Sequence, residues 1–97
     1  NGWVEADVQY TLDAVHTAWP NAQVRLTGVW KNTGVQVSTA QISSACTGRT
    51  SWCAMGADEA VYLQGSDNGA SETYDGQHYS AFGAKQAAAA WRIALGY

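Results

Sequence analysis

Hydrophobic side chains recur every three or four positions over residues 3–19, which is the spacing of one helix face. The members of this stripe are Val4, Val8, Leu12, Val15 and Trp19. Glu5 and Asp7 fall in the first turn, where negative charge complements the helix dipole. Pro20 follows and stops the helix. The pattern predicts an amphipathic helix over residues 3–19, with His16 at its solvent-facing edge.

A short apolar run over residues 23–30 comes next and is bounded by polar residues. Its composition predicts a strand that is buried on both faces, as in a parallel sheet. A helix, a tight turn and a strand make half of a βαβ unit. Gly28 and Trp30 fall near the carboxyl end of this strand, where ligands bind in open α/β sheets. Trp30 belongs either to the core or to the wall of a pocket.

The pattern over residues 31–55 is irregular and leaves alternatives open. Val35 and Val37 alternate with polar residues and could form a short strand. Residues 38–45 could form a helical turn, with Ser38 or Thr39 as its N-cap. We expect Trp52 and Met55 to pack the end of this segment against the body of the protein.

The remaining chain predicts a second strand, a loop and a terminal helix. The strand is placed at residues 60–63, and the Gly-, Ser- and Asn-rich loop follows at 64–73. The helix is predicted over residues 80–95, with Ser80 as N-cap and Gly96 just past its end. The predicted buried face of this helix consists of Ala84, Ala87, Ala88, Trp91, Ala94 and Leu95.

Composition narrows the class of protein. The chain has 97 residues, a net charge of −3 and no basic run, which argues against nucleic-acid binding. No apolar stretch is long enough to span a membrane. Charged residues make up only 13%, so either polar uncharged residues cover the surface or another polypeptide covers part of it. Because the sequence begins at Asn1 without methionine, we expect a processed product.

The two cysteines, Cys46 and Cys53, enclose a short polar loop. Their spacing fits no metal motif, and His16, Asp75 and His78 form no recognisable ligand set either, so we expect no metal site. A disulfide is the preferred interpretation and implies an oxidising, extracytoplasmic compartment for a secreted protein. The alternative is a pair of reduced, buried thiols.

A carboxylate and an imidazole lie three residues apart, at Asp75 and His78. Since they follow a predicted strand and precede a predicted helix, we expect both at the carboxyl edge of the sheet. The aspartate can accept a hydrogen bond from one imidazole nitrogen, and the other nitrogen can take a proton from a nucleophile. The pair is a candidate catalytic site, with Trp30 and Gln77 as candidate substrate-binding residues.

Residues 74–84, Tyr-Asp-Gly-Gln-His-Tyr-Ser-Ala-Phe-Gly-Ala, resemble the last conserved block of the SGNH/GDSL hydrolases. That block reads Asp-Gly-x-His, then a Ser or Asn helix start, two residues, Gly and a terminal helix. The matching positions are Asp75, Gly76, His78, Ser80 and Gly83. The order of the predicted elements before this block also fits the second half of that family.

The resemblance implies that residues 1–97 are the C-terminal half of a three-layer α/β/α (flavodoxin-like) domain with a parallel sheet. It implies hydrolysis of an ester or an acylated carbohydrate through a covalent acyl-enzyme, with no cofactor. His78 would act as general base and then general acid, and Asp75 would orient it. The family's nucleophilic serine lies in a Gly-Asp-Ser block, and its oxyanion hole uses a Gly-x-Asn-Asp block. Because this sequence contains neither block, we expect an N-terminal fragment of the same precursor to supply both.

Two other functions remain open at this point. Five Trp and five Tyr could form a stacking platform in a small secreted carbohydrate-binding module. Alternatively, the loop closed by the cysteines could present Arg49 to a protease, as in an inhibitory protein stapled by one disulfide.

Overall fold

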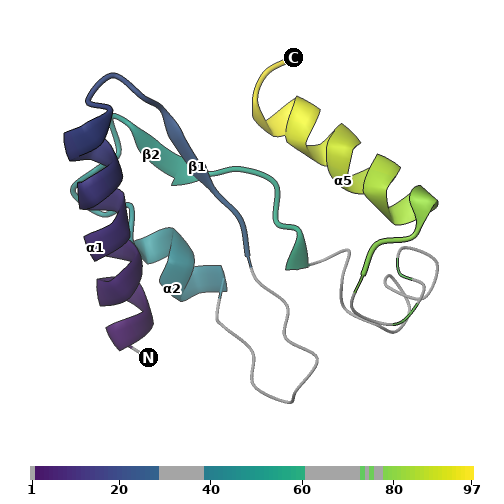
Figure 1. The fold of residues 1–97 in the computed structure, drawn as a ribbon, viewed down its shortest axis with the longest axis horizontal. Coiled ribbons are helices and arrows are strands. Elements are labelled where there is room, and N and C mark those ends of the chain that lie inside the picture. Colours follow the sequence, from purple (N-terminus) through teal and green to yellow (C-terminus); the bar gives the residue numbers. More distant parts are fainter. Residues whose placement is uncertain (1, 29–38, 61–72, 74, 76–77) are drawn as a thin grey trace.

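The computed structural model describes residues 2–28, 39–60, 73, 75 and 78–97. This part of the chain forms three helices and a two-stranded parallel sheet, which makes it a small α/β protein as predicted. In chain order the elements are α1 (Gly2–Ala18), β1 (Val24–Leu26), α2 (Thr39–Ser44), β2 (Cys53–Met55) and α5 (Ala81–Ala94). Figure 1 shows α1 and α2 together on one side of the strands and α5 on the other.

The two strands pair in parallel, with Val24 opposite Cys53 and Leu26 opposite Met55. The first strand is shorter than predicted: it covers Val24–Leu26, its side chains are half-buried, and residues 29–30 lie outside the described part. A second strand was predicted at residues 60–63; Ala60 is helical, and 61–63 lie outside the described residues. The strand that pairs with β1 is Cys53–Met55, which was not predicted. A Cys-Ala-Met run has no β-branched residue to mark it as a strand.

Cys46 and Cys53 form a disulfide in the core, with an S–S distance of 2.06 Å, which confirms the predicted bond. It joins the turn that follows α2 to the first residue of β2. The two cysteines form a buried cluster with Leu12 and Ala45, and half-buried residues pack around it: Val8, Val24, Leu26 and Trp52. The crosslink therefore ties α1, α2 and the sheet into one small core.

Helix α1 matches its predicted range to within one residue, but its apolar stripe is buried only in the middle. Leu12 is 3% exposed and Trp19 is 65% exposed, so the predicted burial of Trp19 is wrong. The reason is length. A helix of 17 residues is about 25 Å long, whereas three-residue strands span only about 10 Å.

The loop between the cysteines is attached to α1 by two side-chain contacts. Arg49 Nε and one of its terminal nitrogens each donate to a different oxygen of Asp13, both at 2.8 Å. This hydrogen-bonded ion pair holds the pKa of the Asp13 carboxyl below its ordinary value and raises the pKa of Arg49. The His16 ring stacks on the Trp52 indole, so His16 is half-buried and not the solvent-edge residue that was predicted.

Helix α5 begins and ends as predicted. Ser80 is the N-cap, and its hydroxyl accepts the Gly83 N–H at 3.0 Å. Gly96 has a positive φ of 81° just past the C-cap residue Leu95. The predicted buried face is only partly right: of its members, Ala87 is buried and Trp91 is half-buried, while Gly83, which was not predicted, is also buried. The other predicted members are exposed: Ala84, Ala88, Ala94 and Leu95. The Trp91 indole N–H donates to Glu59, which fixes the rotation of the helix.

Candidate active site

Asp75 and His78 are joined by two contacts. His78 Nδ1 lies 2.6 Å from Asp75 Oδ2, and the backbone N–H of His78 donates to Asp75 Oδ1 at 2.7 Å. An aspartate readily accepts the N–H of a residue a short distance along the chain, so the Asp-x-x-His spacing produces this turn locally. Both oxygens of one carboxylate thus hold one histidine, and the imidazole is kept in a defined orientation.

The contact between the two side chains determines where the imidazole proton lies. An ionised carboxylate only accepts hydrogen bonds, so Nδ1 must be the donor. Neutral His78 is then the Nδ1–H tautomer, with the lone pair on Nε2. A carboxylate in this position also stabilises the imidazolium that forms when Nε2 takes a proton. The side chains of His78 and Asp75 are 63% and 39% exposed, so this acid–base pair lies at the protein surface.

The backbone on either side of the pair is fixed. Thr73 and Tyr79 form an antiparallel bridge that closes the turn at its base, and Thr73 is 7% exposed. Immediately afterwards Ser80 caps α5. The histidine is therefore held between a backbone bridge and a helix start.

Glu59, which sequence reasoning missed, connects this region to the sheet. Its two carboxylate oxygens accept the Tyr79 hydroxyl and the Trp91 indole N–H, each at 2.9 Å. Its backbone N–H donates to the Thr27 hydroxyl at 2.9 Å, just past β1. The sequence holds no local signal for this role, because the two donors lie 20 and 32 positions further along the chain.

The segments that follow the carboxyl ends of β1 and β2 pack closely against each other beside Glu59. A Cβ atom added to Gly28 would lie 2.1 Å from Asp58 Oδ1 and 2.7 Å from Thr39 Oγ1. The Thr39 hydroxyl donates to Asp58 at 3.3 Å, and the Ala60 N–H donates to the same carboxylate at 3.2 Å. Gly28 is therefore required for close packing, and Asp58 is used to join the start of α2 to the end of β2.

Of the other predicted functional residues, the structure describes Arg49 and the exposed aromatic residues of the first helix. Trp30 and Gln77 lie outside the described residues. Arg49, the residue considered for a protease-facing loop, is bound to Asp13, and its side chain is 21% exposed. Tyr10 and Trp19, at 81% and 65% exposed, lie nine positions apart. That spacing puts them on opposite sides of α1, so these two residues make no common stacking platform.

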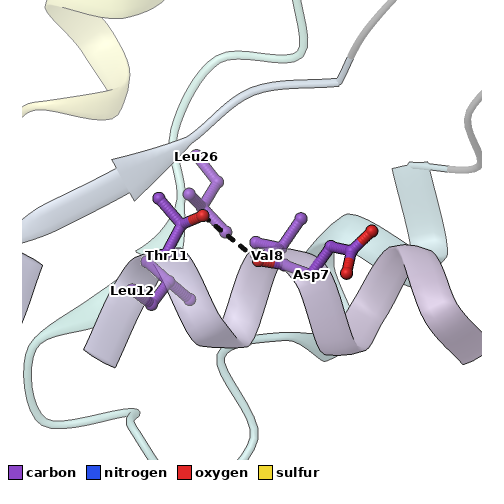
Figure 2. Close-up of a pocket in the computed structure, with 5 residues that line it drawn as sticks. All are labelled: Asp7, Val8, Thr11, Leu12 and Leu26. Carbon is purple, nitrogen blue, oxygen red and sulfur yellow. Dashed lines mark hydrogen bonds between the residues drawn. The ribbon is translucent and has the colours of Figure 1, made fainter. Parts of the chain in front are cut away.

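A hollow away from the acid–base pair lies between α1 and β1 and is shown in Figure 2. It has a volume of about 260 Å³ and a mostly apolar surface, and the residues that line it are Asp7, Val8, Thr11, Leu12 and Leu26. The Thr11 hydroxyl donates to the Asp7 carbonyl within the helix at 3.1 Å. Figure 1 shows α1 on the far side of the strands from the start of α5, so this hollow is separate from the acid–base pair.

No protein-family model, curated protein or solved structure is significantly similar to this chain. Within the described residues, no three or more His, Cys, Asp or Glu side chains converge on a point that could hold a metal ion. None of the described helices combines the length and the apolar character that a membrane span needs.

Proposed function

We propose that this chain contributes the acid–base half of a secreted serine ester hydrolase of the SGNH/GDSL type. The observation that carries the proposal is the 2.6 Å contact between His78 Nδ1 and Asp75 Oδ2. It presents the tautomer and the orientation that a general base needs. The serine and the oxyanion hole come from an N-terminal segment of the same precursor, because Gly-Asp-Ser is missing here.

In this mechanism His78 moves one proton in each half-reaction. Its Nε2 atom takes the proton of the serine hydroxyl as the oxygen attacks the ester carbonyl. The resulting imidazolium, stabilised by Asp75, returns that proton to the departing alcohol, which leaves an acyl-enzyme. Water then attacks the acyl group while His78 takes its proton and returns it to the serine oxygen. The products are a carboxylic acid and an alcohol, and the enzyme is regenerated.

Three features of the structure support this proposal. The strands are parallel, as in the sheets whose carboxyl edges carry active sites. The Tyr79 hydroxyl, next to His78, bonds to Glu59, which follows the carboxyl end of β2. A disulfide in the core suits an extracytoplasmic protein. The three-layer domain and its completion by an N-terminal segment are part of the proposal.

The test is hydrolysis of p-nitrophenyl acetate by the protein together with the segment that carries the serine. His78→Ala should lower kcat/KM by about 10²–10⁴-fold, the usual contribution of a general acid–base group. A serine-directed fluorophosphonate should label the companion segment and leave this chain unlabelled.

His16→Gln is the matched control, since His16 is the other histidine of the chain and stacks on Trp52. It should keep the wild-type rate. Full activity of a folded His78→Ala variant would refute the role of His78. Intact mass and a denaturing gel show whether a second polypeptide is present in the active sample. Activity from this chain alone would overturn the proposed companion segment.

A further inference from the structure

Glu59 is a half-buried carboxylate whose two oxygens have different donors from different parts of the chain. Oε1 accepts the hydroxyl of Tyr79 and Oε2 accepts the indole N–H of Trp91, both at 2.9 Å. Hydrogen bonds to a charged acceptor are about twice as strong as neutral ones. A carboxylate can accept both donors at once, whereas an amide has only one acceptor oxygen.

The position of Glu59 is itself fixed by the sheet. Its N–H donates to the Thr27 hydroxyl beyond β1, and its neighbour Asp58 packs against Gly28. The Trp91 ring lies so close to the backbone after β2 that a Cβ atom on Gly56 would come within 2.1 Å of it. The carboxylate therefore projects from a rigid part of the molecule.

The Tyr79 branch leads directly to the acid–base pair. Tyr79 follows His78 in the chain and forms the bridge with Thr73 that closes the turn containing Asp75 and His78. A displacement of the Tyr79 ring would move this bridge and the histidine beside it.

We propose that Glu59 is a positioning residue, which acts through Tyr79 to hold the Asp75–His78 turn at the carboxyl edge of the sheet. The hydrogen bond from Trp91 attaches α5 to the same carboxylate, so Glu59 positions both the turn and the helix that follows it. The catalytic consequence rests on the proposed hydrolase function, but the effect on the geometry of His78 does not.

The variants separate the two branches. Tyr79→Phe removes only the hydroxyl that binds Oε1. Trp91→Phe removes the indole N–H that binds Oε2, together with the ring atoms beside Gly56, and serves as the control for the other branch. Glu59→Gln keeps the size of the side chain but leaves one of the two donors without an acceptor. Circular dichroism and thermal melting establish that each variant is folded before it is compared.

The first readout is the tautomer of His78, measured by long-range ¹H–¹⁵N NMR on the complete chain. The measurement is made on the neutral imidazole, the form in which the two tautomers differ. Wild type and Trp91→Phe should show the Nδ1–H form. Tyr79→Phe and Glu59→Gln should show a mixture with Nε2–H, because the Asp75 contact is no longer held in place. A wild-type spectrum in folded Tyr79→Phe and Glu59→Gln overturns the positioning role, since a purely structural contact would change only the melting temperature.

The second readout is ester hydrolysis in the presence of the companion segment. Tyr79→Phe and Glu59→Gln should each lower kcat about tenfold or more, with KM within about twofold, because a misoriented base affects the transition state and not binding. If both residues act along one path, the kcat of the double variant should be no lower than that of the less active single variant. Additive losses contradict that path. A changed His78 spectrum in a protein without esterase activity supports the positioning role and rejects the hydrolase proposal.

Discussion

The imidazole of His16 lies parallel to the indole of Trp52, with 4.1 Å between ring centroids and 3° between planes. The contact joins the last turn of α1 to the loop between the cysteines. The same loop is held by the Asp13–Arg49 ion pair one helical turn away. The disulfide thus fixes the base of the loop, and these side chains fix its position on α1.

His16→Ala should lower the free energy of unfolding by about 1 kcal/mol, because a stacked aromatic pair contributes about that much beyond burial. Urea unfolding followed by tryptophan fluorescence measures it. His16→Phe keeps a stacking ring and should recover most of the loss. It should also relieve the desolvation of His16 Nδ1, a buried atom without a hydrogen-bond partner in the described structure. Equal losses in both variants would show that stacking is not the source.

Lowering the pH should remove the contribution of the Asp13–Arg49 pair. The pKa of Asp13 is lower in the folded protein than its ordinary value of 3.8, chiefly because Arg49 donates hydrogen bonds to it. The contribution is therefore fully present above that ordinary value and is lost as the pH falls through the lower, folded-state pKa. Melting temperatures measured across this acid range test the sign: the difference between wild type and Asp13→Asn should shrink as the pH falls. A difference that grows on acidification contradicts this assignment.

The sequence predicted the local features of the fold better than the contacts between distant segments. Helix α1, the Ser80 cap, the Gly96 terminus and the disulfide all depend on residues close together in the chain. By contrast, β2 was not predicted, because Cys53–Met55 becomes a strand by pairing with β1 and not through its own composition. The Asp75–His78 pair was found from spacing, whereas Glu59 was missed because its donors lie 20 and 32 positions away.

Gly56→Ala should destabilise the protein by about 1–3 kcal/mol, the usual cost of inserting a methyl group into a packed site. A Cβ atom there would meet the six-membered ring of Trp91 at 2.1 Å, and the hydrogen bond from the indole N–H to Glu59 holds the ring in this position. Thermal melting of a double-mutant cycle with Trp91→Phe measures the coupling, because the smaller phenyl ring removes the atoms that clash. Gly56→Ala should cost clearly less in that background. An equal cost in both backgrounds would locate the strain elsewhere.

Asp75→Ala should convert neutral His78 from the Nδ1–H form towards the Nε2–H form, since the acceptor for Nδ1–H is removed. Long-range ¹H–¹⁵N NMR detects the change without any substrate. If the proposed hydrolase function is right, the same substitution should lower kcat by about 10²-fold or more in the presence of the companion segment, because the imidazolium loses its stabilising carboxylate. Asp7→Ala, which removes an exposed carboxylate on α1, is the control with the same change in charge. An unchanged His78 spectrum in Asp75→Ala would show that another group sets the tautomer.

The Asp75–His78 contact joins residues only three positions apart, and this locality has a consequence for assembly. Closing so short a loop costs little conformational entropy, so the imidazole is already oriented before any other polypeptide binds. In the proposed hydrolase, association with a serine-bearing segment would have to supply only a hydroxyl and an oxyanion hole to a histidine that is already oriented. The onset of activity would be governed by the encounter of the two parts and not by a slow rearrangement within this one.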